Sequence, residues 1–103
     1  MTDGDPGVYD PTDAVTEIAP GFWQIDIGFQ GRRGVIATYL LAGEDQVTLI
    51  ETGPSSCLTN LRAGLAQIGF GVGDLTHILV THIHLDHSGA AGPITRENPT
   101  AVV

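Results

Sequence analysis

The stretch "THIHLDH" (81–87) holds three of the four histidines in this chain. The fourth, His77, lies upstream at the beginning of a short apolar run. In an extended segment, residues two apart project to the same side. His82, His84 and Asp86 therefore share one side, and the two apolar residues between them point toward the other. The pattern predicts a strand end that presents imidazole and carboxylate groups together.

Imidazole and carboxylate groups at this spacing are typical donors of a metal centre. His82 and His84 can reach one ion at the usual Zn–N distance of about 2.0–2.1 Å. Asp86 and His87 diverge from that pair and are better placed to bind a second ion beside the first. This donor set suits zinc, and also iron or manganese. The alternative to a metal site is that these side chains form the solvated face of an edge strand, which so dense a cluster disfavours. His77 has the opposite parity to His82 and is expected to be an ordinary strand-end histidine.

The composition is that of an acidic globular chain. Its 103 residues carry a net charge of −8, with four arginines and no lysine, and 42% of them are apolar. Such a field repels polyanions, which argues against a nucleic-acid partner. The single cysteine, Cys57, cannot form an internal disulfide, which fits a reducing compartment. Residues 1–13 have no apolar run of a signal peptide, and no stretch is long enough to span a bilayer, so we expect a cytoplasmic protein with no membrane partner.

The order of elements predicts an α+β fold. Residues 1–17, rich in Asp, Pro and Gly, are expected to form a flexible arm that precedes a domain portion over residues 18–103. Alternating or continuous apolar runs predict strands over residues 22–29, 35–42, 46–51 and 77–81. A hairpin is expected between the first two strands. The second strand is apolar on both sides and is expected to be covered on both faces.

Apolar residues at helical spacing predict one helix before the histidine stretch. The stripe consists of Leu58, Leu61, Leu65 and Ile68. We expect Ser55 or Ser56 to cap this helix and Gly69 to end it.

Beyond the histidine stretch, small residues predict a helix capped by Ser88. "GPITRENP" (92–99) is interpreted as a turn-like connection, and "TAVV" (100–103) as the first half of a strand. A chain that stops inside a strand is expected to be the front part of a longer fold.

Other catalytic motifs are weaker. Cys57 lies near a helix N-terminus, where a thiolate is favoured, but no histidine is close to it in sequence. Ser55 and Ser56 are in no "GxSxG" context. The glycine-rich "GFGVG" (69–73) follows a helix instead of a strand, so it does not fit a phosphate loop.

"THIHLDH" resembles the HxHxDH signature of the metallo-β-lactamase superfamily. "LIETG" (49–53) resembles that family's strand-end element, which has Asp where this chain has Glu51. The similarity in element order runs from about Ile18 to Val103. The resemblance implies a four-layer αβ/βα sandwich with metals at the sheet edges, of which this chain supplies about the N-terminal half.

The resemblance also implies roles for individual residues. His82 and His84 would bind the first metal, and Asp86 and His87 the second. Asp86 would also be catalytic, by orienting the attacking water. The remaining ligands would come from later in the chain. Glu51 would be a supporting residue at most, and a plain strand-end carboxylate is the alternative.

The function expected from the resemblance is a metal-dependent hydrolase with two divalent ions, zinc first and iron or manganese as alternatives. A metal-bound hydroxide would attack a small ester, thioester, lactone or amide, and only with the missing C-terminal half present. An iron-dependent sulfur dioxygenase or a flavodiiron-type oxidoreductase is one alternative. A non-catalytic fragment, or half of a split protein, is another. One apolar sheet face would be left uncovered, so the chain alone is expected to bind metal weakly and to associate with the missing half or with itself.

Overall fold

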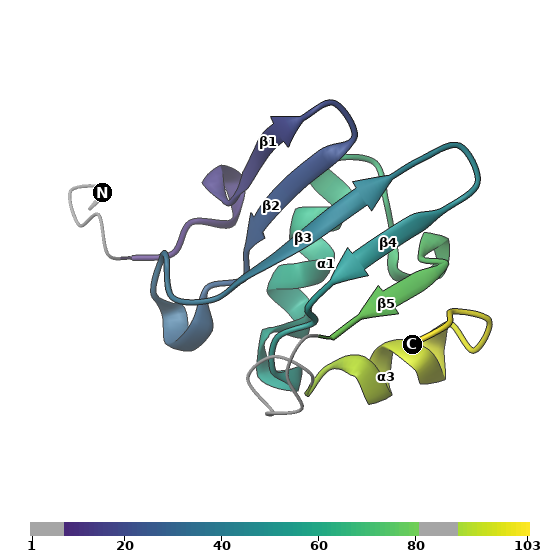
Figure 1. Cartoon of the computed structure of the whole chain (residues 1–103). Helices are drawn as coiled ribbons and strands as arrows, with labels where there is room; N and C mark the ends of the chain where they lie inside the picture. The colour runs from purple at the N-terminus through teal and green to yellow at the C-terminus, as the bar shows by residue number, and fades with distance from the viewer. Residues whose placement is uncertain (1–7, 81–88) are drawn as a thin grey trace.

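The computed structural model describes residues 8–80 and 89–103, which form one sheet with helices packed on one of its faces (Figure 1). The strands of this part of the chain lie in sequence order across the sheet. They are β1 (Val15–Ala19), β2 (Phe22–Asp26), β3 (Ala37–Ala42), β4 (Val47–Ile50) and β5 (His77–Leu79). The first four form an antiparallel meander, and β5 joins parallel to β4. The expected α+β class is confirmed.

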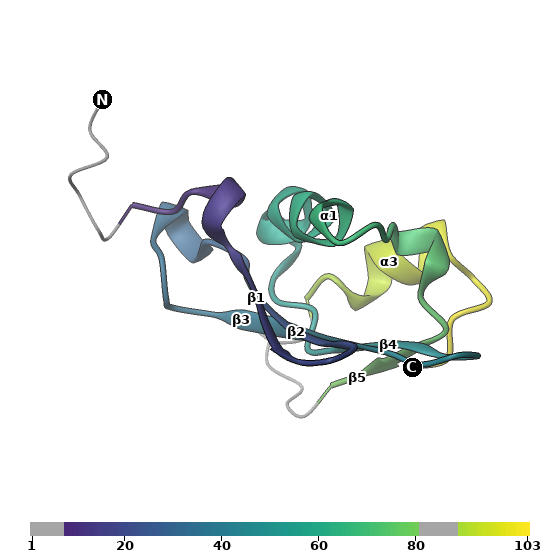
Figure 2. The same ribbon diagram turned by 90° about the horizontal axis from the view of Figure 1, so that it is seen from above.

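Two α-helices, α1 (Leu58–Gln67) and α3 (Ala91–Glu97), lie on the same face of the sheet (Figure 2). The parallel pairing of β4 with β5 needs a crossover, and α1 supplies it. Short 3-10 helices occupy several connections: η1 (Pro11–Asp13), η2 (Phe29–Gly31), η3 (Ser55–Cys57) and η4 (Val72–Asp74). In the described part of the chain, no helix combines the length and the apolar character needed to cross a bilayer.

The core lies between α1 and the covered face of the sheet. Leu61 and Leu65 of the predicted stripe are fully buried, and the two outer members of the stripe pack against the same cluster. From the sheet and the residue directly after β2, the fully buried side chains of this cluster are Ile25, Ile27, Leu40, Leu49 and Ile78. The alternation that predicted strand β2 therefore also identified its buried face.

One glycine sets how closely α1 approaches the sheet. A Cβ atom added to Gly64 would lie 2.5 Å from Cγ2 of Ile25 on β2. Because real Cβ contacts are longer than this, the helix axis could not keep its position with any larger residue at 64.

The opposite face of the sheet is covered by no helix or strand of residues 8–80 and 89–103 (Figure 2). The register places Phe22 beside Leu41, and Ile50 beside Tyr39 and Leu79, on this side. Leu41 and Leu79 are 48% and 54% exposed. The expected uncovered apolar face is confirmed, whereas the expectation that residues 35–42 are covered on both faces is wrong for this chain.

The N-terminal arm expected over residues 1–17 stays a prediction. Residues 1–7 lie outside the described residues. Within residues 8–17, Asp10 caps η1, because its side chain accepts from the amide of Thr12, and β1 pairs with β2 from Val15 onward. Asp10 and Pro11 belong to the acidic, proline-containing stretch that predicted a loose arm, and in the structure they cap and begin η1.

Two further expectations differ from the structure. The turn-like connection expected over residues 92–99 is mostly helix α3, because Pro93 falls in the first turn, where helical N–H groups have no partner within the helix. The expected serine cap is also absent: Ser55 and Ser56 lie inside η3, and neither η3 nor α1 has a side-chain cap hydrogen bond. Gly69 does end α1, with φ of +85°.

Candidate metal centre

The expected metal ligands His82, His84, Asp86 and His87 lie outside the described residues. The structure defines the frame around them: the strand from which that stretch starts and the point at which the chain returns. Within residues 8–80 and 89–103, no three His, Cys, Asp or Glu side chains are arranged to hold a metal ion.

The histidine stretch starts from an edge where two strands end together. β4 and β5 are parallel and in register, with Ile50 beside Leu79. The amide of Glu51 donates to the carbonyl of Leu79 at 2.7 Å, which extends the ladder one residue past β4. Residue 51 and the beginning of the histidine stretch are therefore attached to the same edge of the sheet.

The chain returns from the histidine stretch to the same loop. The amide of Ala90 donates to the carbonyl of Gly53 at 2.9 Å. Ala90 is fully buried and precedes the first residue of α3. Two described residues that flank the histidine stretch, Leu79 before it and Ala90 after it, are thus both hydrogen-bonded to residues 51–53.

Glu51 has an unusual backbone for its residue type. Its φ is +69°, a region that non-glycine residues seldom adopt, and the residue is only 7% exposed. Gly53 also has a positive φ, and the hydroxyl of the fully buried Thr52 donates to the Gly53 carbonyl at 3.0 Å. Left-handed backbone at a buried, non-glycine position persists only when its surroundings hold it, and such positions cluster at functional sites.

His77 lies away from this edge. It begins β5, beside Thr48, and its Nδ1 lies 2.9 Å from the hydroxyl oxygen of Thr76. The structure places it as expected, at the end of β5 opposite to the histidine stretch.

Cys57 is a packing residue. It is 3% exposed, and burial raises the pKa of its thiol. A thiol that keeps its proton at neutral pH is a poor nucleophile. Its interpretation as a core residue agrees with this environment.

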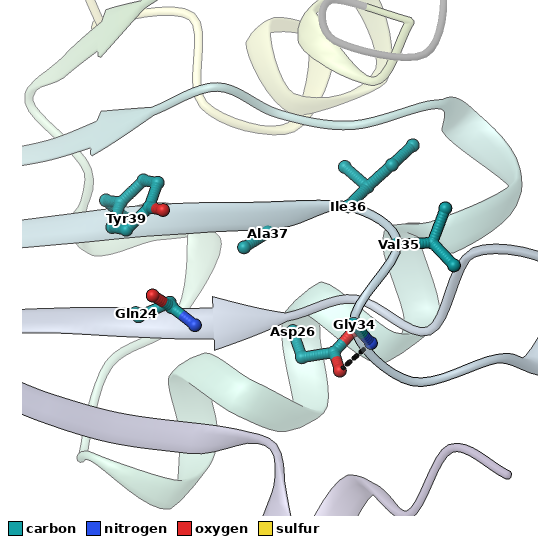
Figure 3. Close-up of a pocket in the computed structure, with 7 residues that line it drawn as sticks. All are labelled: Gln24, Asp26, Gly34, Val35, Ile36, Ala37 and Tyr39. Atoms are coloured by element: carbon teal, nitrogen blue, oxygen red, sulfur yellow. Dashed lines mark hydrogen bonds between the residues drawn. The ribbon is translucent and has the colours of Figure 1, made fainter. Parts of the chain in front are cut away.

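The connection between β2 and β3, residues 27–36, was predicted only as a hairpin, although it lies at the same edge of the sheet as the end of β4. Asp26 accepts from the amide of Gly28 at 3.0 Å, near the beginning of the connection. It also accepts from the amide of Gly34 at 2.8 Å, near its end (Figure 3). The signal in the sequence is an aspartate two residues before a glycine, which is the pattern of an Asx turn. Beside this clamp is a hollow of about 300 Å³, lined among others by Gln24, Val35, Ile36 and Tyr39.

Comparisons with known proteins agree with this arrangement. The family model described as the metallo-beta-lactamase superfamily matches residues 31–103. No curated protein gives a match.

Solved structures show the same fold. BJP-1, a subclass B3 metallo-beta-lactamase of Bradyrhizobium japonicum, is similar with a TM-score of 0.75 and 20% identity over 99% of this chain and 35% of its own. Native FEZ-1 metallo-beta-lactamase from Legionella gormanii is similar with a TM-score of 0.74 and 18% identity, over 94% of this chain and 33% of its own. A beta-lactamase from Chitinophaga pinensis is similar with a TM-score of 0.71 and 24% identity, over 86% of this chain and 31% of its own. The chain spans about a third of the length of these structures.

Proposed function

Because the chain belongs to the metallo-beta-lactamase superfamily, we propose that it contributes the first metal ligands of a metal-dependent hydrolase of small carbonyl compounds. The observation that carries the proposal is the attachment of the histidine stretch, at Leu79 and at Ala90, to residues 51–53. Rigid strands and a buried loop are the kind of frame that fixes donors well enough for metal binding. Since the chain spans about a third of its structural relatives, we propose this activity for the complete fold and not for these 103 residues alone.

The chemistry of the donor set fits two divalent ions. We propose that His82 and His84 hold one ion and that Asp86 and His87 hold the other. Neutral imidazoles with one carboxylate suit zinc, and a chain that carries −8 favours cations in general. When bound, such ions supply a Lewis acid that acidifies water and stabilises negative charge on an oxygen.

The residues of the chain itself orient the reactants. In this proposal Asp86 accepts a hydrogen bond from the attacking water and so directs its lone pair toward the carbonyl carbon. Glu51, buried at the strand end, is proposed to help hold the backbone from which the ligands project. Supporting contacts of this type fix the orientation of ligands, and their loss typically costs about 10–100-fold in metal affinity or activity.

The proposed substrates are small esters, thioesters, lactones and amides. The similar structures are described as beta-lactamases, and a β-lactam is a cyclic amide, so it belongs to this set. The acidic charge of the chain disfavours nucleic acid as a substrate.

The test is metal quantification and turnover on the protein in its natural length, and it compares a histidine of the stretch that follows β5 with the histidine that begins β5. His82→Ala is expected to lower the metal content by about one ion per chain and to abolish hydrolysis of all four carbonyl classes. His77→Ala is the matched control, because His77 lies at the opposite end of the strand, and it is expected to keep both metal and turnover. Unchanged metal in His82→Ala contradicts the ligand assignment. Iron with oxygen consumption, in place of zinc with hydrolysis, contradicts the reaction.

A further inference from the structure

The N-terminal segment lies across the connection between β2 and β3. The amide of Tyr9 donates to the carbonyl of Gly31 at 3.0 Å, and Val8 forms an antiparallel bridge with Arg32. Further along, the guanidinium of Arg33 lies 3.7 Å from the carboxylate of Asp13. Residues 8–13, which are distant in sequence, are thus bound to residues 27–36 (Figure 1).

The ring of Tyr9 makes the closest of these contacts. A Cβ atom added to Gly28 would lie 2.4 Å from Cγ of Tyr9 and 2.6 Å from each Cδ atom. The ring therefore lies flat against the backbone of Gly28, which has a left-handed conformation with φ of +61°. Glycine at this position is required twice, by its φ angle and by the ring above it.

The hydroxyl of Tyr9 contributes little to this contact. Its oxygen is buried, and it has no hydrogen-bond partner among the described residues. Burial, and then the nearby carboxylate of Asp26, raise the pKa of Tyr9, so the ring carries no charge at neutral pH. The contact to Gly28 is consequently one of shape and apolar surface.

The connection that Tyr9 holds borders the proposed metal edge. Tyr39, near the beginning of β3, pairs with Ile50, the last residue of β4. The connection from β2 into β3 therefore lies at the edge where Glu51 follows β4. It presents Val35, which is 53% exposed, and Ile36 beside the hollow (Figure 3).

We propose that Tyr9 is a positioning residue that holds residues 27–36 in the shape that contacts the apolar part of the substrate. The proposal rests on the proposed function, because it places substrate at this edge. Tyr9 acts through the backbone of Gly28 and does not touch the reacting atoms. A loop that is already ordered binds substrate without losing further conformational entropy. Loosening the loop therefore weakens substrate binding more than it slows the chemical step.

The experiment compares three variants of the metal-loaded protein in its natural length. Tyr9→Ala is expected to speed hydrogen exchange of the amides of residues 28–34 by about tenfold or more. It is also expected to raise KM by about fivefold, with kcat within about twofold and metal content unchanged. Tyr9→Phe keeps the ring and is expected to behave as the unmodified protein. Val8→Ala removes an adjacent exposed side chain and is the matched control.

The outcomes separate this proposal from the hydrolase itself. Unchanged exchange in Tyr9→Ala, or an equal effect of Tyr9→Phe, overturns the anchoring role. Faster exchange with unchanged KM overturns the role in substrate binding. If the unmodified protein hydrolyses none of the carbonyl substrates, the proposed function fails and the substrate-binding role fails with it, while the exchange data still decide whether Tyr9 anchors the connection.

Discussion

The amide of Ala90 donates a hydrogen bond to the carbonyl of Gly53 across 2.9 Å, and this contact ties the far end of the histidine stretch to the loop after β4. The near end is tied to the same loop, through the amide of Glu51 and the carbonyl of Leu79. Residues 51–53 therefore hydrogen-bond to described residues on both sides of the histidine stretch, which we propose to bind metal. Substitutions there should change metal affinity more than equally destabilising substitutions elsewhere.

Gly53→Ala tests this directly. Gly53 has φ of +72°, so a side chain strains the loop and is expected to cost about 1 kcal/mol of stability. Gly69→Ala is the matched control, because Gly69 has φ of +85° and open space around it at the end of α1. We expect similar losses of stability in denaturant titrations of both variants. Only Gly53→Ala should weaken zinc binding in a competition titration; equal zinc affinity in the two variants would refute the control by residues 51–53.

Glu51 offers a second test at the same loop. Aspartate tolerates a positive φ better than glutamate does, so Glu51→Asp is expected to fold with equal or slightly higher stability. Glu51→Ala keeps the unfavourable backbone and removes a buried carboxylate from its contacts, which should cost about 1–3 kcal/mol. Thermal melting of both variants beside the unmodified protein measures this order. An alanine variant that melts at the same temperature would show that the carboxylate does not support the fold.

Gly64 tests the close approach of α1 to the sheet. In an exposed helix, Gly→Ala raises stability by about 1 kcal/mol. At Gly64 the new methyl group collides with Ile25, and overpacking of a core typically costs about 1–3 kcal/mol, so a net loss is expected. Gly73→Ala, where no atom lies within 4 Å of the added Cβ, is the neutral control. Chemical denaturation of the two variants should differ in midpoint, and a stabilised Gly64→Ala would contradict the packing described here.

The buried thiol of Cys57 predicts an alkaline loss of stability. Burial raises its pKa above the value of 9.0 expected in the unfolded chain, so the unfolded state releases the proton first as pH rises. The contribution of Cys57 is therefore complete below about pH 9 and declines as pH rises through the native pKa. Unfolding free energy measured from about pH 7 to about pH 10 should fall less steeply in Cys57→Ala. Parallel curves for the two proteins would show that Cys57 does not contribute.

The uncovered sheet face predicts association of the 103-residue chain. Because no helix or strand of the described residues covers this face, two copies are expected to bury it against each other, since exposed apolar patches of this kind are interaction sites. Leu41→Lys places a charge on the face, where Leu41 is 48% exposed, and should shift the chain toward monomer in sedimentation experiments. Val8→Lys, with a similar exposure of 53% away from the sheet, should not. A monomeric unmodified chain would contradict the prediction.

Local patterns in the sequence determined much of the fold. Alternation in residues 22–29 predicted β2 and its buried face, and the helical stripe from Leu58 to Ile68 predicted α1. These features are readable because side-chain period and turn residues depend on neighbours in the chain. The same local reading placed a helix in the small residues after the histidine stretch but ended it before residue 92, whereas α3 continues to Glu97, since Pro93 breaks a helix only beyond its first turn.

The candidate ligands also come from the sequence alone and stay a prediction, because imidazole and carboxylate donors at this spacing are typical of metal sites. Only the tertiary structure decided which loop holds that stretch, that Glu51 has a left-handed backbone, and that the ring of Tyr9 lies on Gly28. Each of these features joins segments distant in the chain, or forces a residue out of its preferred conformation. Such contacts cost conformational entropy and backbone strain, and the packing free energy of the whole fold offsets that cost. A local sequence pattern does not contain this balance, because it depends on residues distant in the chain.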